Sequence, residues 1–312
     1  MRVVITGGAG FIGANLCRRL LATPAVTEIV VIDDLSTGSR GNIDALPVDF
    51  VEGSITDDAA LDRAFAGSSA VVHLAALGSV PRSVLDPVAS HHANATGTLM
   101  VLEAARRHDN LHTMVASSSS VYGSNPVLPK HEDLACRPMS PYAASKLATE
   151  GYALAYGSSY ALPVLAFRFF NVFGPLQPAG HAYAAVIPSF VDAALSGEPL
   201  TVHGDGTQSR DFTYVGTLTS VIADAISRRV TSVEPVNLAF GTRVSLLDVI
   251  TGIEAILGHE VRRQHTAVRV GDVPHSQADN SRLTQLFPGL SPIEFGDGLR
   301  ATVEWMRTTR DA

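Results

Sequence analysis

A glycine-rich stretch, Thr6-Gly7-Gly8-Ala9-Gly10-Phe11-Ile12-Gly13, decides the fold of this chain. It follows a short apolar run at residues 3–6 and opens an amphipathic segment at residues 11–21. Glycines at positions 7, 10 and 13 lack a Cβ atom, so they permit a tight turn and let the backbone approach a pyrophosphate closely. The first N–H groups of the following helix would then face the phosphates with the positive end of the helix dipole. With a strand before it and a helix after it, the stretch predicts a dinucleotide-binding turn.

The sequence beyond this turn alternates short apolar runs with amphipathic segments. Such alternation is typical of right-handed βαβ units and of a parallel sheet covered on both faces. We therefore predict an α/β fold with a Rossmann-like, doubly wound parallel sheet. The predicted strands are residues 3–6, 29–33, 48–52, 70–75, 113–117 and 164–169, and the predicted helices are residues 11–21, 57–65, 87–107 and 142–160.

The pattern changes after Asn171, where a loop rich in glycine and proline begins. We predict a smaller, discontinuous α/β substrate-binding lobe there, with the chain crossing back into the first lobe. The first lobe would comprise residues 1–170 plus about 213–242, and the second about 171–212 plus 243–312. The helices predicted in this part are residues 184–196, 218–229, 246–257, 281–286 and 298–307, and the extended segments are 200–203, 211–215, 235–239 and 261–265.

The composition narrows the function classes. The chain has 312 residues, 46% of them hydrophobic, and a formal net charge of -7. This length and apolar content suffice for a large core, and the negative charge argues against a general nucleic-acid or anionic-membrane partner. The two cysteines make no disulfide framework, there is no signal-peptide pattern, and no apolar run is long enough to span a membrane. We expect a soluble cytoplasmic protein. His91 and His92 are adjacent and would diverge on a helix, so we predict no metal site.

Only two of the 23 basic residues are lysines, Lys130 and Lys146. Such a composition indicates a coding bias against lysine, as in a GC-rich actinobacterial-type genome. Lys146 follows Tyr142 by four residues, behind Ser140 and Pro141, which suit the N-cap and first position of a helix. Tyr142 and Lys146 would thus share one helix face, where the ammonium favours the phenolate and creates a general base for a hydroxyl group.

Two further positions lie where the predicted strands end. Asp33 ends the second strand, twenty residues after Gly13, and could bind ribose hydroxyls and repel a 2′-phosphate, which favours NAD over NADP. Its alternative role is a solvated turn residue. Four consecutive serines, residues 117–120, end the fifth strand, where doubly wound sheets bind ligands. Their hydroxyls could bind a substrate alcohol or carboxylate, or could cap the local backbone instead.

These motifs occur together with His73-Leu74-Ala75-Ala76, residues 168–175 (RFFNVFGP), residues 204–212 (GDGTQSRDF) and residues 269–276 (RVGDVPHS). In this order the chain resembles the extended short-chain dehydrogenase/reductase family, and within it the NAD-dependent UDP-sugar 4-epimerases, over nearly its whole length. The resemblance implies an isomerase that is a homodimer and binds NAD in the first lobe and a nucleotide sugar in the second. Its catalytic residues would be Ser118, Tyr142 and Lys146.

The resemblance also implies two sets of binding residues. NAD would contact Gly7, Gly10, Phe11, Ile12, Asp33, Leu74, Ala75, Asn94, Tyr142 and Lys146. The UDP-sugar would contact Ser79, Ser118, Ser119, Ser120, Tyr142, Asn171, Val186, Arg210, Arg269, Asp272 and Ser276.

The expected reaction is oxidation and re-reduction at C4 through a 4-keto intermediate. Related dehydratases carry an Asp-Glu pair where this chain has Ser119 and Ser120, and serines cannot perform that acid–base work. Ser276 lies where family members restricted to non-acetylated hexoses carry a bulky aromatic residue. A small residue there leaves room for a larger sugar substituent. UDP-glucuronate, converted to UDP-galacturonate, is the leading substrate, because the serine run could hold a C6 carboxylate. The arginine-rich composition also resembles that of uronate epimerases from actinobacterial antibiotic pathways of the moenomycin type.

Four alternatives stay open, one of them a catalytically inactive NAD-binding regulator, although such proteins usually lose the Tyr/Lys pair that this chain keeps. Residues 78–83 and 182–188 resemble UDP-N-acetylglucosamine 4-epimerases, and UDP-glucose is a related substrate. A more distant alternative is an NAD(P)-dependent nucleotide-sugar reductase.

Overall fold

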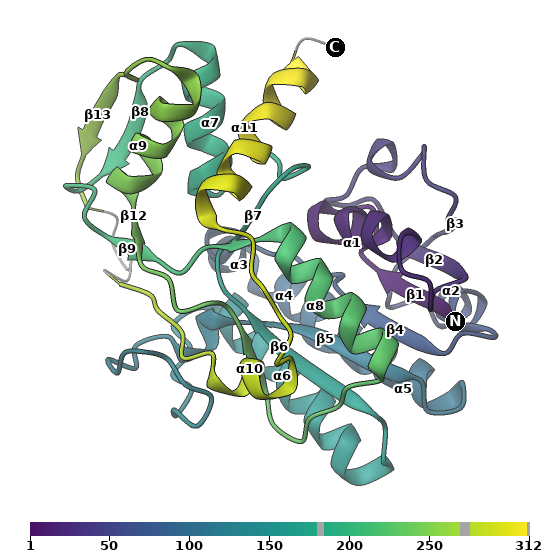
Figure 1. The fold of residues 1–312 in the computed structure, drawn as a ribbon. Coiled ribbons are helices and arrows are strands. Elements are labelled where there is room, and N and C mark those ends of the chain that lie inside the picture. The colour runs from purple at the N-terminus through teal and green to yellow at the C-terminus, as the bar shows by residue number, and fades with distance from the viewer. Residues whose placement is uncertain (180–183, 269–274, 311–312) are drawn as a thin grey trace.

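The computed structural model describes residues 1–179, 184–268 and 275–310. At its centre lies a parallel sheet in the order β11-β6-β5-β4-β1-β2-β3 (Figure 1). Its strands are β1 (Arg2–Thr6), β2 (Glu28–Asp33), β3 (Asp49–Glu52), β4 (Ala70–His73), β5 (His112–Ser118), β6 (Val164–Phe169) and β11 (Val236–Leu238). The strand order runs outward from β1 in both directions, so the carboxyl ends of β1 and β4 form the switch point where such sheets bind ligands.

Helices cover both faces of this sheet. Successive residues of β1 point to opposite sides, so Val3 and Ile5 pack in one core and Val4 in the other. The first core contains residues of α1 (Phe11–Leu21), α8 (Val215–Arg228) and α10 (Ser281–Leu286). The second contains residues of α2 (Asp58–Phe65), α5 (Gly97–Arg107) and α6 (Pro141–Tyr160). Burial on both faces explains why the strands are continuous apolar runs.

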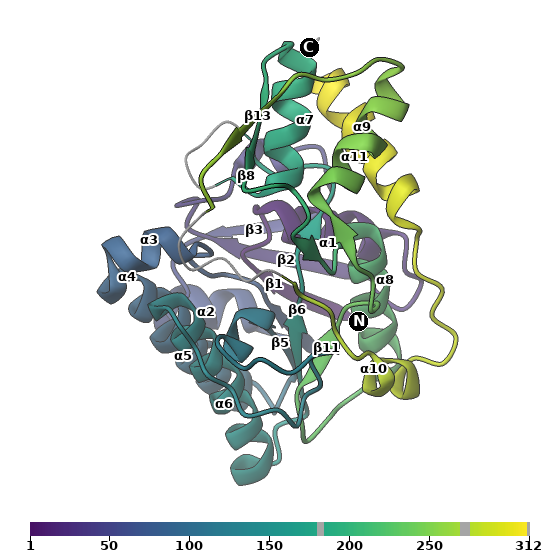
Figure 2. The ribbon, with the colours of Figure 1, turned by 90° about the vertical axis from the view of Figure 1, so that its left-hand side faces the viewer.

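A smaller lobe lies above the carboxyl edge of the sheet (Figure 2). Its separate core contains residues of α7 (Val186–Ser196), β8 (Leu200–His203), α9 (Leu246–Leu257) and α11 (Phe295–Arg310). Three short strand pairs complete it: β8 with β13 (Arg263–Thr266), β9 (Ser209–Arg210) with β12 (Val244–Ser245), and β7 (Val172–Phe173) with β10 (Thr213–Tyr214).

The α/β fold with a Rossmann-like parallel sheet is confirmed, and several helical segments differ from the prediction. The helix predicted at 87–107 consists of α4 (Pro87–His91), a π-helical turn (His92–Thr96) and α5. An additional helix, α3 (Val80–Leu85), precedes it, because Ser79 caps its N-terminus by accepting the N–H of Arg82. Within the extended segment predicted at 211–215, only Thr213–Tyr214 forms a strand, and α8 begins at Val215, three residues before the predicted start.

The chain crosses between the lobes more often than the predicted boundaries imply. Strand β11 joins the central sheet beside β6. Residues Leu283 and Phe287 lie in the range assigned to the second lobe, but they pack in the core of the first, where the Phe287 ring lies 6.3 Å from that of Phe167. Helix α10 is therefore a separate return of the chain to the sheet.

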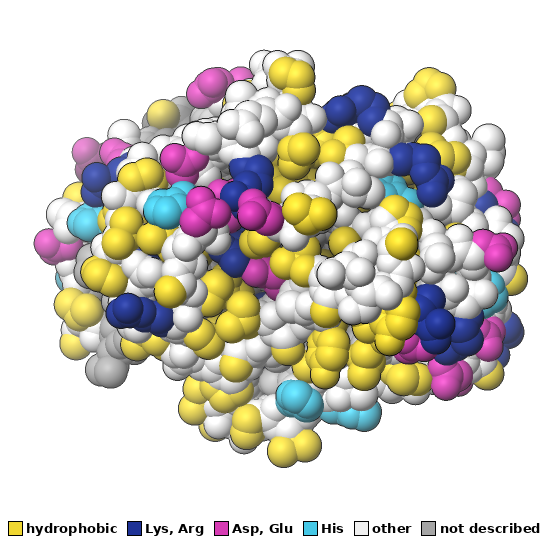
Figure 3. All heavy atoms as spheres, turned by 90° about the horizontal axis from the view of Figure 1, so that it is seen from below, with side chains coloured by type: hydrophobic (Ala, Val, Ile, Leu, Met, Phe, Trp, Pro, Cys, Tyr) yellow, Lys and Arg dark blue, Asp and Glu magenta, His cyan; other side chains and the backbone are white. Residues whose placement is uncertain are grey.

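Two surface properties bear on possible partners. No helix within the described ranges is long and apolar enough to cross a membrane. On the face seen from below, basic and acidic side chains are interspersed with apolar ones and form no large patch of one sign (Figure 3).

Candidate active site

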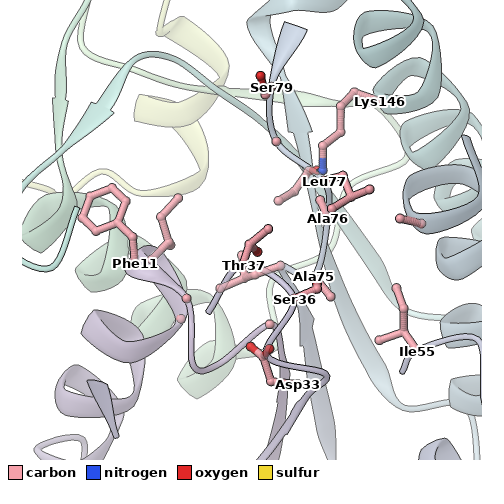
Figure 4. A pocket seen from close by; sticks show the side chains of 18 of the residues that line it. Phe11, Asp33, Ser36, Thr37, Ile55, Ala75, Ala76, Leu77, Ser79 and Lys146 are labelled. Atoms are coloured by element: carbon pink, nitrogen blue, oxygen red, sulfur yellow. The ribbon is translucent and has the colours of Figure 1, made fainter. Parts of the chain in front are cut away.

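A cavity of ≈ 1030 Å³ opens at the carboxyl ends of the central strands (Figure 4). The turn after β1, the end of β2, the loop after β4, the end of β5 and the start of α6 contribute to its wall. It brings together most of the predicted cofactor and catalytic residues, Gly7, Gly10, Phe11, Ile12, Asp33, Leu74, Ala75, Ser118, Tyr142 and Lys146, with two predicted substrate residues, Ser79 and Asn171.

The glycine turn has no room for side chains. Gly7 adopts a φ of +70°, and a Cβ atom there would lie 2.7 Å from the backbone nitrogen of Ala75. A Cβ atom on Gly13 would lie 2.3 Å from the carbonyl oxygen of Gly7. No side chain caps α1 at Gly10, so the first N–H groups of this helix remain as donors at the cavity wall. Such an uncapped N-terminus suits the pyrophosphate of a dinucleotide.

Asp33 forms the far end of the cavity. One carboxylate oxygen accepts the N–H of Ala9 at 3.0 Å and the other accepts the N–H of Leu35 at 2.9 Å. Burial raises the pKa of Asp33, while these two backbone hydrogen bonds oppose the rise. Each oxygen keeps a lone pair for a ribose hydroxyl. Arg40, the nearby basic residue, bonds Asp44 and lies over the Phe50 ring.

Sequence reasoning missed several residues at this end. Ser36 and Thr37 follow β2, and further residues follow β3, whose carboxyl end lies at the same sheet edge. The general rule that ligands bind at the carboxyl ends of parallel strands could have found them. The additional lining residues are Asp34, Ser36, Thr37, Gly53, Ser54, Ile55 and Thr56.

The predicted catalytic pair, Tyr142 and Lys146, lies on the first turns of α6. Ser140 caps this helix by accepting the N–H of Ala143 at 3.1 Å, as the sequence predicted for an N-cap residue. The Lys146 ammonium donates to the carbonyl oxygen of Ala116 at 2.8 Å, and burial lowers the pKa of Lys146 to about 8. Burial raises the pKa of Tyr142, and a hydrogen bond with the Ser118 hydroxyl opposes that rise.

The serine run is not an open row of hydroxyls. Ser118 lines the cavity, whereas Ser119 and Ser120 lie in the 3₁₀ turn (Ser119–Tyr122) and are not among the lining residues. The Ser118 oxygen caps this turn by accepting the N–H of Ser120 at 3.2 Å, and it also accepts the Ser120 hydroxyl at 2.9 Å. The capping alternative thus accounts for part of the run.

Asn94 lies behind the cavity wall. Its oxygen accepts the N–H of Leu77 at 2.8 Å, and its amide nitrogen donates to the Leu77 carbonyl at 3.2 Å and to the Ser145 hydroxyl at 2.9 Å. The side chain is buried and is not among the lining residues. It therefore links the loop after β4 to α6.

A second cavity, of ≈ 260 Å³, adjoins the first. Predicted substrate residues Asn171, Val186 and Arg210 line it. Asn171 also lines the first cavity, so the two cavities are neighbours at that residue. Residues newly found in this wall are Thr201, His203, Gln208 and Phe212.

Of the remaining predicted substrate residues, one lies within the described ranges. Arg269 and Asp272 lie outside the described residues. The backbone N–H of Ser276 bonds the carbonyl oxygen of Ser209 at 3.0 Å, and Ser276 is not among the lining residues of either cavity.

The arrangement suits hydride chemistry on a nucleotide-linked alcohol, and known proteins support that reading. The sequence profile of the "NAD dependent epimerase/dehydratase family" matches residues 3–239. The chain belongs to this family. It is 34% identical to the UDP-glucose 4-epimerase of Mycolicibacterium smegmatis, over 98% of this chain and 99% of that protein.

Two solved structures of family relatives are similar over nearly all of both chains. The UDP-N-acetylglucosamine 4-epimerase from Methanobrevibacter ruminantium, in complex with UDP-N-acetylmuramic acid, is 35% identical with a TM-score of 0.92 over 99% of this chain and 98% of that one. The UDP-glucuronic acid 4-epimerase from Bacillus cereus, in complex with UDP-glucuronic acid and NAD, is 30% identical with a TM-score of 0.89 over 99% of this chain and 100% of that one.

NAD is the cofactor of this family, and the residues of the first cavity fit it. The glycine turn leaves no Cβ atom between the helix N-terminus and a pyrophosphate. Asp33 keeps free lone pairs for ribose hydroxyls, and its negative charge disfavours a 2′-phosphate.

Proposed function

We propose that this chain is an isomerase, an NAD-dependent UDP-sugar 4-epimerase, and that its substrate is UDP-glucuronate, which it converts to UDP-galacturonate. The charged residues of the cavity wall are the reason for choosing UDP-glucuronate among the candidate sugars. The acidic residues of the described wall, Asp33 and Asp34, follow β2 at the adenosine end. The other charged residues of the described wall, Lys146 on α6 and Arg82 on α3, are cations. A part of the wall whose described charged groups are cations suits a sugar that carries a carboxylate.

Arg82 is well placed to contribute to this selectivity. It belongs to α3, one turn after Ser79, whose hydroxyl caps that helix. Its guanidinium could bind a carboxylate with two parallel hydrogen bonds, which a neutral sugar does not offer.

In the proposed mechanism, bound NAD supplies the hydride acceptor and then the hydride donor at C4, so there is no net redox change. Tyr142 removes the proton of the C4 hydroxyl and returns it after the 4-keto sugar has rotated within the site. Lys146, held by the Ala116 carbonyl, favours the Tyr142 phenolate through its positive charge. Asn171 and Arg210, which line the second cavity, would hold the diphosphate while the sugar turns.

The alternative reactions require different residues in the cavity wall. Dehydration needs an acid and a base beside C5 and C6, and the chain has Ser119 and Ser120 at the corresponding positions. UDP-N-acetylglucosamine and UDP-glucose remain the second candidates, favoured by the two relatives with those names. A net reductase would require NADH or NADPH that exchanges with solution in every turnover.

The NAD-loaded protein is tested with three candidate substrates. UDP-glucuronate, UDP-N-acetylglucosamine and UDP-glucose are incubated separately and the products are separated by chromatography. We expect UDP-galacturonate to form with the highest kcat/KM. Arg82→Gln should lower kcat/KM for UDP-glucuronate about tenfold to a hundredfold, the worth of a hydrogen bond to a charged group, with little change for UDP-glucose.

The controls separate the sugar from the reaction. Tyr142→Phe should abolish turnover of every substrate while NAD stays bound. A preference for UDP-N-acetylglucosamine, or an equal loss for all sugars in Arg82→Gln, would overturn the glucuronate assignment and leave 4-epimerisation standing. Consumption of added NADH in proportion to product would contradict epimerisation itself.

We also propose a homodimer formed through α5 and α6. These helices lie side by side on the outer side of the first lobe, and α6 exposes Gly151, Ala155 and Tyr152, whose exposed fraction is 41%. Small residues around an exposed aromatic side chain permit close helix packing against a second copy.

A further inference from the structure

The two lobes are connected by several crossings of the chain (Figure 2). The chain passes between the central sheet and the smaller lobe after β6, after β10, after β11, before α10 and before α11. Asp211 lies between β9 and β10, at the second of these crossings, and its side chain is fully buried. It follows Arg210, which lines the second cavity. The contacts of Asp211 therefore bear on how the two lobes are held together.

The Asp211 carboxylate accepts four hydrogen bonds from two other crossings. One oxygen accepts the N–H of Phe240 at 3.4 Å and the hydroxyl of Thr242 at 3.1 Å. The other accepts the N–H of Gly241 at 2.9 Å and the N–H of Ala278 at 3.0 Å. The first three donors follow β11, and Ala278 precedes α10. A carboxylate has about four lone-pair sites, so these neutral donors occupy all of them.

The backbone of Asp211 holds the crossing that follows β6. Its carbonyl oxygen accepts the side-chain amide of Asn171 at 3.0 Å, and the Asn171 carbonyl accepts the N–H of Thr213 at 3.2 Å. Asn171 lines both cavities. Three apolar residues beside these crossings pack in one buried cluster: Phe170, Ala239 and Ala278. The crossings after β6, β10 and β11 and the one before α10 thus meet at one buried residue.

We propose that Asp211 is a positioning residue that fixes the smaller lobe relative to the central sheet, so that the nucleotide sugar in the second cavity faces NAD in the first. The inference rests on the proposed placement of these two ligands. Rotation of the smaller lobe would break bonds at the carboxylate, because separate crossings are joined there. Asp211 lines neither described cavity, so it acts on the reaction through the arrangement of the lobes.

Asparagine has nearly the same shape as aspartate but only one oxygen in its side chain. Its amide group would direct N–H donors at two of the donors that the carboxylate now accepts. Depending on how the amide is turned, either Phe240 and Thr242 or Gly241 and Ala278 would lose their acceptor. Asp211→Asn should therefore loosen the junction between the lobes while the packing volume changes little.

The first test separates kcat from ligand affinity in Asp211→Asn, with whichever UDP-sugar the protein turns over. We expect kcat to fall on the order of a hundredfold, the effect of a displacement of about 1 Å, whereas KM and the Kd for NAD change less than about threefold. Rates are measured well below Tm and per folded molecule, so lower stability alone does not reduce kcat. Asp205→Asn is the matched control. Its carboxylate accepts the N–H and hydroxyl of Thr207 at the surface, and kcat should stay unchanged.

Thr242→Val tests the same junction with a smaller change, in case Asp211→Asn does not fold. It removes one of the donors to the carboxylate and should lower kcat in the same direction but by less. In the Asp211→Asn background it should add little, because both substitutions act through one carboxylate. Fully additive losses would contradict a shared junction.

A second measurement needs no substrate, so it tests the inference even if the proposed function fails. Spin labels at Arg63→Cys on α2 and Glu304→Cys on α11, both exposed, report the distance between the lobes by pulsed electron paramagnetic resonance. Cys136→Ser removes the partly exposed native thiol from every protein compared, and dilution with unlabelled chain removes distances between copies. Asp211→Asn should broaden the distance distribution, and Asp205→Asn should not. An unchanged distribution, an unchanged kcat in folded Asp211→Asn, or a loss that lies wholly in KM would each overturn the proposal.

Discussion

Lys146 lies at a predicted catalytic position, and burial of its charged ammonium lowers the stability of the folded chain. Its side chain is 6% exposed, and the described contact of its ammonium is the carbonyl oxygen of Ala116. Burial without a carboxylate partner disfavours the charged form and lowers its pKa from 10.5 to about 8. At neutral pH the protein therefore holds a charged ammonium in an environment that opposes the charge. The chain keeps a lysine there although it has almost no others.

Lys146→Met should therefore stabilise the protein without NAD while abolishing turnover. The unfolded chain binds this proton more readily than the folded one, so the charge costs free energy below about pH 8. The gain in Tm should be largest below about pH 8 and should shrink as the pH rises through 10.5, above which Lys146 is neutral in both states. Calorimetry of both proteins across this pH range checks the trend. A gain that is constant with pH would contradict it.

At the scale of elements, the π-helical turn between α4 and α5 positions Asn94. In this turn the chain gains one residue relative to a regular helix, which directs Asn94 toward the loop after β4. The periodicity of residues 87–107 predicted a helix and could not reveal the turn, because its apolar residues still face the sheet. The turn nevertheless determines where the Asn94 side chain lies. It lies behind the cavity wall and does not line the cavity itself.

Asn94→Leu should lower the free energy of unfolding by at least about 1–3 kcal/mol, the cost of leaving a buried polar group without a partner. Leu77 would lose both of its backbone partners. NAD affinity should also fall, because Leu77 lines the cavity. Urea denaturation and NAD titration measure the two effects. Asn280→Ala, where the side chain caps nothing, is the control and should change neither. Wild-type stability in Asn94→Leu would refute the linking role.

Local patterns made several parts of the site predictable. The glycine turn and the Tyr142–Lys146 pair lie within single short segments, so spacing alone indicates their geometry. Arg82 on α3 and Ser54 in the loop after β3 reach the cavity from separate parts of the chain, and only the folded chain shows it. The sequence likewise could not tell that Ser120 faces Ser118, because hydroxyl direction depends on the turn that follows β5.

For the whole molecule, the cavity is polarised along its length. Acidic groups line the end beside β2, and cations line the end beside α3 and α6. This separation agrees with the distribution of functions proposed for the two ends: ribose hydroxyls at the acidic end and an anionic sugar at the basic end. Sequence patterns predicted Asp33 and Lys146 but not Asp34, and they left the role of Arg82 open, since its position depends on the unpredicted α3.

The proposed dimer leads to a test at the same scale. Tyr152→Glu places a charge at the centre of the exposed face of α6, and it should convert the dimer to a monomer, because burying an unpaired charge opposes association. Light scattering after size-exclusion chromatography measures the mass. Val233→Glu, at a position with an exposed fraction of 92% outside α5 and α6, should leave it unchanged. A wild-type chain with the mass of a monomer would contradict the proposal.

The interleaved path of the chain limits how the two lobes can be exchanged with those of other proteins. The sheet that holds NAD takes β11 from beyond the first segment of the smaller lobe, and α10 returns to it after a further excursion. No single contiguous gene fragment can therefore encode the NAD-binding lobe. Exchange of one contiguous segment with another protein would break up the central sheet or carry part of the smaller lobe with it.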